Sequence, residues 1–304
     1  MKNSAQSFKS QKTGKPKIRL NTGEGYTFVN KVVKTNNLHT VCEEAQCPNI
    51  YECWERRTAT IMILGDICTR ACGFCSVKTG KPNWNDTLEP IRTAQAVKQM
   101  NLRHVVITSV DRDDLKDDYG SGIWAETIKQ VRQKVPGCTI EVLTPDFKGS
   151  NFALNRVFCA YPDIFSHNVE CVERISRRVR SQADWQRSLK VLVKSVKFGL
   201  RTKTGLMVGL GETNEEVLNT MKEVAEIGVE IFTIGQYLQP TKNHLPVERY
   251  VEFEEFEFFR KKGMELGFKV VESGPLVRSS YHADEQARPT NTPAHEHPVN
   301  QSYF

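Results

Sequence analysis

Residues 60–75 read TIMILGDICTRACGFC, and this stretch decides the fold of the chain. Its first part, 60–64, is largely apolar and rich in β-branched side chains, which predicts a buried strand. Gly65 begins the loop that follows, and this loop has a C-x3-C-x2-C spacing. The spacing brings three thiols together at the end of a strand, at Cys68, Cys72 and Cys75.

The same succession of strand and helix repeats along the chain and predicts a mainly parallel sheet. Further strands are expected at 104–108, 139–143, 164–167, 204–208 and 231–235. Helices are expected at 91–100, 122–134, 152–158, 171–177, 184–196, 215–226 and 253–266. Thr213, followed by Glu216, forms a capping box at the start of one of them. The pattern predicts an α/β fold, a partial (β/α)6 TIM-like barrel with its functional groups where strands end and loops begin.

Length favours one large domain, because 304 residues is near the size of a single α/β barrel. We expect the barrel at 58–272, a cysteine-bearing N-terminal extension at 1–57 and a C-terminal extension at 273–304. The tail from residue 284 is rich in proline, histidine and polar residues, which predicts disorder. No apolar run approaches the roughly 20 residues that span a bilayer, so no membrane role is expected.

Positive charge is concentrated at the N-terminus, where residues 1–20 contain no acid. The basic residues there are Lys2, Lys9, Lys12, Lys15, Lys17 and Arg19. They equal the formal net charge of +6, so the rest of the chain is balanced and offers no basic stripe for nucleic acid. A solvated tail, a contact with an acidic protein and an organellar transit peptide all stay open. The segment lacks the apolar region of a secretory signal, and we expect a cytoplasmic protein, with mitochondrial or plastid origin as the alternative.

Nine cysteines in a chain without an export signal indicate metal or redox chemistry rather than disulfides. A second array, with a C-x4-C-x5-C spacing, precedes the first in the chain at Cys42, Cys47 and Cys53. A [4Fe–4S] cluster normally takes four cysteines, so each array leaves one iron without a thiolate. The alternatives are a zinc site for the later array and incidental thiols for the earlier one. Three other cysteines have no ligand spacing and are interpreted as core or helix residues, namely Cys138, Cys159 and Cys171.

The later array, with Phe74 beside its last cysteine and a strand before it, resembles the signature of the radical S-adenosylmethionine superfamily. The resemblance implies that the open iron binds the amino and carboxylate groups of S-adenosylmethionine. It also implies that an electron from the cluster cleaves the carbon–sulfur bond and generates a 5′-deoxyadenosyl radical. The protein around such a cofactor contributes positioning and excludes water.

The two arrays together are similar to those of the lipoyl synthase family, and the similarity covers about residues 19–283. It implies an auxiliary [4Fe–4S] cluster held by Cys42, Cys47, Cys53 and the second serine of an RSSY motif, here residues 278–281. By position that serine is Ser280, with Ser279 as the close competitor. An alkoxide is a harder donor than a thiolate, so this corner of the cluster should open easily. Easy opening suits a cluster whose own sulfide is consumed.

The resemblance also implies the reaction of a sulfurtransferase, the insertion of two sulfur atoms at C6 and C8 of an octanoyl chain to form the lipoyl cofactor. The expected partners are octanoylated lipoyl carrier domains, such as 2-oxoacid dehydrogenase E2 subunits and the glycine cleavage H protein. An electron donor such as ferredoxin or flavodoxin is expected too. A biotin synthase-like enzyme would hold its auxiliary ligands inside the barrel, and a methylthiotransferase would add a nucleic-acid-binding domain. A non-catalytic electron-transfer or zinc protein would need closed four-ligand sites.

Contacts with S-adenosylmethionine are assigned by the same resemblance. Asn168 and Glu170 follow the fourth strand, where an amide can bond a carboxylate or hydroxyl and a carboxylate can accept from ribose. Arg180 is the candidate for the cofactor carboxylate, with an ordinary helix-surface arginine as the alternative. A glycine-bearing element at 203–213 is expected near the adenine, through Gly205, Gly209 and Glu212. The charge run at 111–114 is interpreted equally as a cofactor contact or a solvated surface.

Overall fold

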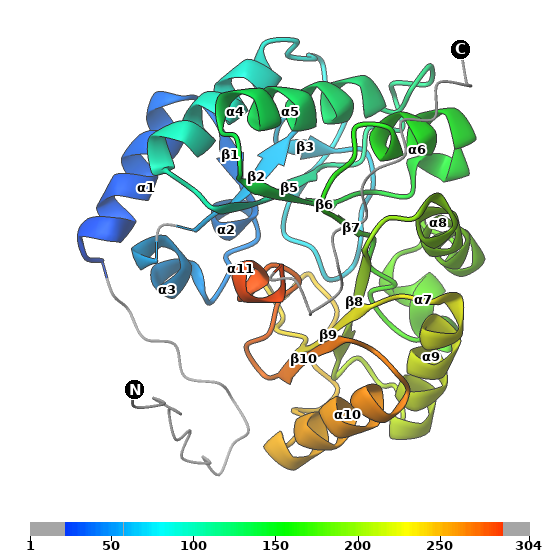
Figure 1. Cartoon of the computed structure of the whole chain (residues 1–304). Coiled ribbons are helices and arrows are strands. Elements are labelled where there is room, and N and C mark those ends of the chain that lie inside the picture. The colour runs from blue at the N-terminus through cyan, green and yellow to red at the C-terminus, as the bar shows by residue number, and fades with distance from the viewer. Residues whose placement is uncertain (1–21, 57, 288–304) are drawn as a thin grey trace.

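The computed structural model describes residues 22–56 and 58–287, and it is built around one eight-stranded sheet (Figure 1). The strand order is β1-β2-β5-β6-β7-β8-β9-β10, and each pair of neighbours is parallel except β1 with β2. The strands are β1 (His39–Thr40), β2 (Thr60–Ile63), β5 (His104–Ser109), β6 (Thr139–Leu143), β7 (Ile164–Ser166), β8 (Thr202–Val208), β9 (Ile231–Gln236) and β10 (Val270–Gly274). Across the described ranges no ladder joins β10 to β1, so the predicted partial α/β barrel is confirmed.

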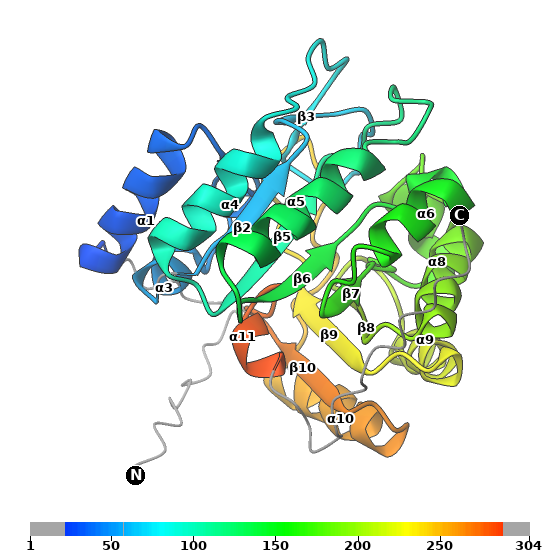
Figure 2. The ribbon, with the colours of Figure 1, turned by 45° about the horizontal axis from the view of Figure 1, so that its top comes forward.

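Helices cover the outer face of the sheet (Figures 1 and 2). They are α4 (Glu89–Met100), α5 (Ser121–Lys134), α6 (Asn151–Phe158), α7 (Glu173–Val179), α8 (Trp185–Phe198), α9 (Asn214–Ile227) and α10 (Phe253–Glu265). In α5 the buried residues Trp124, Ile128 and Val131 recur at helical spacing and form one apolar face. The capping box predicted for α9 is confirmed, because Thr213 accepts from the Glu216 amide at 3.2 Å and Glu216 accepts from the Thr213 amide at 2.8 Å.

The expected strands and helices are all present, and their bounds shift by only a few residues. Strand β10 was missed by the sequence patterns, and the boundary placed after residue 272 falls inside it, so the division at that point stays a prediction. A separate pair of short parallel strands, β3 (Ile67–Cys68) and β4 (Lys78–Thr79), closes the base of the cysteine loop.

The N-terminal extension is folded against the β2 edge of the barrel from residue 22 onward. It contains α1 (Glu24–Thr35), α2 (Val41–Glu44) and α3 (Ile50–Glu55), and β1 adds an antiparallel edge to β2. The ring of Tyr26 on α1 stacks at 5.5 Å from Tyr51 and lies 5.1 Å from Trp54, which is fully buried. These contacts hold the cysteine-bearing α3 in place. The basic residues at 1–20 lie outside the described residues.

The C-terminal segment is ordered further than its composition predicts. The expectation of disorder from residue 284 is wrong for the start of the tail, because α11 (Ala283–Gln286) forms there. Arg56 binds Asp284 at 3.3 Å and Glu285 at 3.1 Å, and Ala283 is buried. Long-range partners therefore order a polar stretch that has no apolar pattern of its own. The remainder of that tail, 288–304, lies outside the described residues.

Candidate active site

A large cavity of about 490 Å³ lies at the carboxyl ends of the barrel strands. The ends of β5, β6 and β9 contribute Thr108, Leu143 and Gln236, and β8 contributes Leu206 to its wall. Both cysteine arrays reach the same cavity, through Cys42, Cys47, Cys68, Cys72 and Cys75. The fold therefore places two sets of thiols, which lie on different segments, around one cavity.

The later cysteine loop is pinned from two sides. The Gly73 amide donates to the Val179 carbonyl at 2.8 Å, and the Gly73 carbonyl accepts from the Leu245 amide at 3.0 Å. A Cβ at position 73 would lie 2.9 Å from the Leu245 side chain, so only glycine fits without a shift. His244 Nε2 lies 2.9 Å from the Cys75 carbonyl oxygen. The loop is thus held between the end of α7 and the segment that follows β9.

The thiols of this loop lie in an environment that disfavours free thiolates. Burial raises the pKa of Cys72 to about 12 and the pKa of Cys68 to about 11, and the Asp111 carboxylate adds to both increases. Thiolates become stable in such a place when a cationic metal centre neutralises them. These thiols are therefore not free, reactive cysteines, and the convergence of Cys68, Cys72 and Cys75 on one cavity is what fits a metal cofactor.

The earlier array has the same character. Cys42 is on α2 and Cys53 is on α3, and both line a smaller cavity together with Cys47. Burial, and after it the neighbouring thiols, raise the pKa of Cys42 to about 11 and the pKa of Cys53 to about 12. Three mutually repelling groups in one buried place again fit a shared metal centre.

The distances among the sulfur atoms of each array can be compared with the distances that a single zinc ion requires. Tetrahedral zinc with Zn–S bonds of about 2.3 Å holds its sulfurs roughly 3.8 Å apart. In the part of the chain that the structure describes, the three Sγ atoms of neither array all lie within 4.8 Å of one another. Neither array therefore has the geometry of a preformed tetrahedral zinc site, and both leave room for a larger, multinuclear group such as a [4Fe–4S] cluster.

The two serines of the RSSY motif point to different partners. Ser280 lines the smaller cavity with the earlier cysteine array, and its Oγ accepts from Thr60 Oγ1 at 2.7 Å. Ser279 does not line that cavity, and its Oγ accepts instead from Asn168 Nδ2 at 2.7 Å. The residue that faces the earlier array is therefore Ser280, whereas Ser279 faces the end of β7.

Three predicted cofactor contacts lie together at the cavity wall beyond β7. Arg180 donates to the Asn168 carbonyl at 3.3 Å and to Ser188 Oγ at 2.9 Å, while its Nε has no partner. Asn168 Oδ1 and His167 Nε2 are also buried without partners. Glu170 has a left-handed φ of 68°, which is rare for such a residue and concentrates at functional sites. Orphaned buried polar atoms facing a cavity fit a polar ligand such as S-adenosylmethionine.

The glycine-bearing element divides into two parts. Gly205 lines the cavity on β8, and a Cβ there would lie 2.1 Å from Thr233 Oγ1. Gly209 and Glu212 lie in the turn after β8 and do not line the cavity. The Glu212 carboxylate accepts from the Gly209 amide at 2.6 Å and from the Leu210 amide at 2.9 Å. Glu212 therefore shapes the turn, and the expected adenine contacts of Gly209 and Glu212 stay predictions.

Some residues of the site were not singled out by the sequence patterns. Arg278, the first residue of the RSSY motif, lines both cavities. Burial raises the pKa of Cys47, and the Arg278 guanidinium partly opposes that increase. The charge run at 111–114 is split, because Asp111 lines the cavity whereas Arg112 forms a bidentate pair with Asp114 at 2.8 Å. The sequence showed charged residues inside or beside the motifs, but it did not show which of these side chains turn toward the cavity. That depends on the fold.

Comparison with protein families and curated proteins gives consistent relatives. The model of the radical SAM superfamily matches residues 62–224. The lipoyl synthase of Rubrobacter xylanophilus is 56% identical over 272 residues, which cover 89% of this chain and 84% of that protein. The lipoyl synthase of Halalkalibacterium halodurans is 54% identical over 89% of this chain and 90% of its own length. That of Flavobacterium psychrophilum is 53% identical over 90% of this chain and 95% of its own length.

Solved structures share the architecture at low identity. Methylornithine synthase (PylB) aligns with a TM-score of 0.52 at 12% identity, over 84% of this chain and 79% of that chain. Streptococcus suis SuiB aligns with a TM-score of 0.56 at 9% identity, over 75% of this chain and 53% of that chain. At such identities the likeness concerns the fold alone. Throughout the described ranges, every helix is too short or too polar to cross a bilayer.

Proposed function

The chain belongs to the lipoyl synthase family of the radical S-adenosylmethionine superfamily, and from this premise we propose which of its residues serve each step. It is a sulfurtransferase that forms the lipoyl cofactor by inserting two sulfur atoms at C6 and C8 of a protein-bound octanoyl-lysine. Its cofactors are S-adenosylmethionine and [4Fe–4S] clusters. The observation that carries the residue assignment is the single cavity lined by two separate sets of buried thiols.

Cys68, Cys72 and Cys75 hold the cluster that binds S-adenosylmethionine in this proposal. Their loop follows β2, the first strand of the parallel part of the sheet, and their buried thiols need a cationic partner. When bound, S-adenosylmethionine and the cluster at these cysteines would supply the radical that removes hydrogen from an unactivated carbon, and the cluster at the earlier array would supply sulfide. Asn168, Glu170 and Arg180 bind the polar groups of S-adenosylmethionine, which is supported by the orphaned Asn168 Oδ1 and Arg180 Nε at the cavity wall.

Cys42, Cys47, Cys53 and Ser280 hold the auxiliary cluster. The choice of Ser280 is supported by its place beside these cysteines, while Ser279 is engaged by Asn168. Thr60 Oγ1 donates to Ser280 Oγ, so the serine oxygen receives a hydrogen bond that stabilises negative charge on it. The residues of this chain thereby orient a weak oxygen ligand at one corner, which suits a site that must release sulfide.

The substrate side of the proposal concerns the apolar part of the lining of the shared cavity. Leu143, Leu206 and Met207 are apolar residues of the shared cavity, and they suit an octanoyl chain that must lie between the hydrogen-removing and the sulfur-donating ends. A substrate chain bound in this cavity would displace water from around a reactive carbon radical. The protein substrates are octanoylated lipoyl carrier domains, such as 2-oxoacid dehydrogenase E2 subunits and the glycine cleavage H protein. A ferredoxin or flavodoxin supplies the electrons. The protein acts in the cytoplasm.

The test separates the two centres. Anaerobically reconstituted protein is mixed with an octanoylated carrier domain, S-adenosylmethionine and a reductant, and mass spectrometry measures the sulfur added to the carrier. Cys72→Ala loses both 5′-deoxyadenosine release and sulfur insertion, whereas Cys42→Ala keeps the release and loses the insertion. Cys159→Ala is the matched control, because this cysteine is exposed and lines neither cavity. Equal loss of both products in Cys42→Ala and Cys72→Ala would contradict separate roles.

A further inference from the structure

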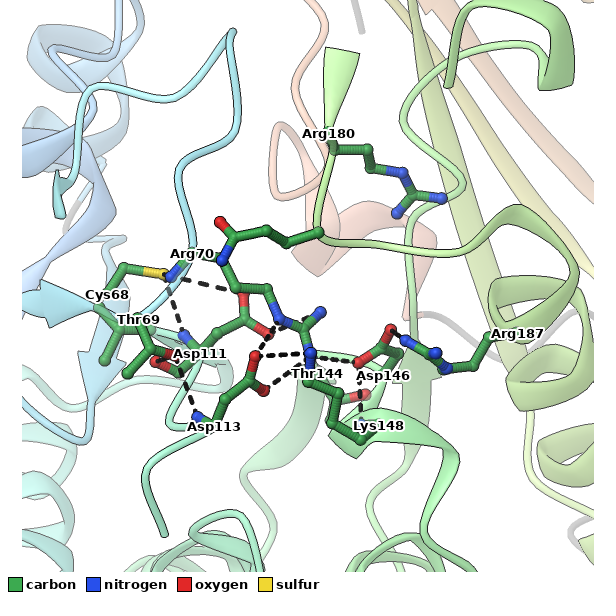
Figure 3. Close-up of polar contacts among 12 residues, drawn as sticks. Cys68, Thr69, Arg70, Asp111, Asp113, Thr144, Asp146, Lys148, Arg180 and Arg187 are labelled. Atoms are coloured by element: carbon green, nitrogen blue, oxygen red, sulfur yellow. Dashed lines mark hydrogen bonds and ion pairs between the residues drawn. The ribbon is translucent and has the colours of Figure 1, made fainter. Parts of the chain in front are cut away.

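Arg70 is a buried arginine inside the later cysteine loop, between Cys68 and Cys72, and its side chain is only 4% exposed. Its guanidinium contacts three carboxylates (Figure 3). Two parallel bonds of 2.8 Å reach Asp113, one of 2.7 Å reaches Asp146, and an ion pair of 3.2 Å reaches Asp111. One side chain therefore joins the cysteine loop to three acidic residues.

These carboxylates come from the ends of two other strands. Asp113 follows β5 and Asp146 follows β6, so Arg70 ties the loop after β2 to the loops after its next two neighbours in the sheet. Lys148 binds Asp113 at 3.0 Å and Arg187 on α8 binds Asp146 at 3.1 Å. With Asp111, three acids face three bases, so the formal charges of the network sum to zero, and its centre at Arg70 and Asp146 is buried. The network stabilises the fold only while every ion pair in it is intact, because a buried charge that loses its partner costs free energy.

The backbone of the same two loops meets at Cys68. The Thr69 amide donates to the Asp111 carbonyl at 3.0 Å, and the Asp113 amide donates to Thr69 Oγ1 at 3.0 Å. In consequence, the Asp111 amide points at Cys68 Sγ from 3.3 Å and the Arg70 amide from 3.5 Å. Hydrogen bonds to cluster sulfurs raise the reduction potential of an iron–sulfur centre. The position of the loop at 110–114 would thus influence the reduction potential of an iron–sulfur centre bound to Cys68.

We propose that Arg70 is a positioning residue that clamps the loop after β5 onto the cysteine loop. It thereby fixes the corner at Cys68 and keeps two amide donors on that sulfur. The inference rests on the proposed function of Cys68, Cys72 and Cys75 as cluster ligands. A fork with several donors is needed to bridge three carboxylates, so lysine at this position keeps the charge but not the geometry.

The experiment uses the full chain with Cys42, Cys47 and Cys53 replaced by alanine, so that a single cluster site remains after anaerobic reconstitution. Arg70→Lys and Arg70→Gln are compared in this background by two readouts. One is the midpoint reduction potential, followed by electron paramagnetic resonance, and the other is the rate of iron release to a chelator. Arg249→Gln is the matched control, because it removes an arginine–carboxylate pair to Glu255 of 2.7 Å and does not line the cavity.

In Arg70→Gln we expect a more negative potential and iron release at least tenfold faster, since both the positive charge and the clamp are lost. Arg70→Lys shifts both readouts in the same direction but less, and Arg249→Gln leaves both unchanged. Wild-type potential and release rate in Arg70→Gln would overturn the inference. If Arg70→Gln retains no cluster, the Arg70→Lys variant provides the test. A wild-type reduction potential and a wild-type rate of iron release in Arg70→Lys would then overturn the inference. If the parent background itself binds no cluster, the cysteine assignment fails and the inference falls with it.

Discussion

Replacing Gly235 with alanine should disable the auxiliary site and spare the other centre. A Cβ at position 235 on β9 would lie 2.1 Å from the Val277 carbonyl oxygen, in the backbone that leads to Ser280. Contacts of a real Cβ below 3.0 Å are essentially never found, so the carbonyl must retreat by roughly 1 Å. The displaced segment carries Arg278 and Ser280, which face the earlier cysteine array.

The expected effects of Gly235→Ala on stability, iron content and lipoyl formation follow from this steric overlap. Overpacking of this size costs about 1–3 kcal/mol, which a domain with ordinary stability survives. The chain should therefore fold, but iron content after reconstitution should fall from about eight to about four per chain, one [4Fe–4S] cluster being lost. We expect 5′-deoxyadenosine release to continue while lipoyl formation drops at least tenfold. Iron analysis, Mössbauer spectroscopy and mass spectrometry of the carrier measure these quantities.

The adjacent strand supplies the control. Gly274 on β10 is the register partner of Gly235, but a Cβ at 274 would lie 3.4 Å from Val277 Cγ2, which is an ordinary contact. Gly274→Ala should keep both clusters and near-normal sulfur insertion. Full iron content and wild-type lipoyl formation in Gly235→Ala would refute the claim that the close approach of Val277 sets the position of Ser280.

Two further predictions concern the residues after β7. Burial lowers the pKa of His167 from 6.5 to about 4, so its neutral form is required in the folded state and stability is lost as pH falls from about 6.5 to 4. The loss due to His167 reaches about 3 kcal/mol at the acid end. Denaturant unfolding of apoprotein should therefore show a larger loss of stability between about pH 6.5 and 4 in the parent than in His167→Asn, which keeps the contribution of the buried His104. Identical pH profiles of the two proteins would contradict the prediction. Arg180→Lys should raise the KM for S-adenosylmethionine roughly tenfold or more with a smaller change in kcat, because lysine lacks the guanidinium fork. An unchanged KM in steady-state kinetics would remove Arg180 from the binding site.

On the proposed assignment of the two cysteine arrays, their arrangement accounts for how one chain could remove hydrogen and add sulfur. Each array lies on its own short segment, the later one after β2 and the earlier one on α2, α3 and the residues between them. Both segments border the same cavity, so a carbon radical formed at one side need not leave the protein to meet sulfide at the other. A shared cavity of this kind is a form of positioning, which contributes several kcal/mol to reactions between bound groups.

Local patterns were sufficient for most of the barrel. Strand β6 has the bounds that its β-branched residues predict, and the capping box at Thr213 starts α9 as expected. Strand β10 was missed because residues 270–274 mix apolar and polar side chains, and the strand is fixed by its pairing with β9. Helix α11 was missed for a similar reason, because its partner Arg56 is more than 200 residues away in the chain.

What the sequence determined by itself is what short-range chemistry encodes: the strand-and-helix alternation, the spacing of both cysteine arrays and the RSSY motif. Those features predicted the fold and the family without any long-range information. Only the tertiary structure decided which serine faces the earlier cysteine array, because the contact of Ser280 with Thr60 joins residues 220 positions apart in the chain. It also decided that Lys203 on β8 and Glu141 on β6, both fully buried, pair at 2.8 Å although β7 lies between these two strands in the sheet. The physical reason is that such contacts depend on the order and register of strands, which no local pattern specifies.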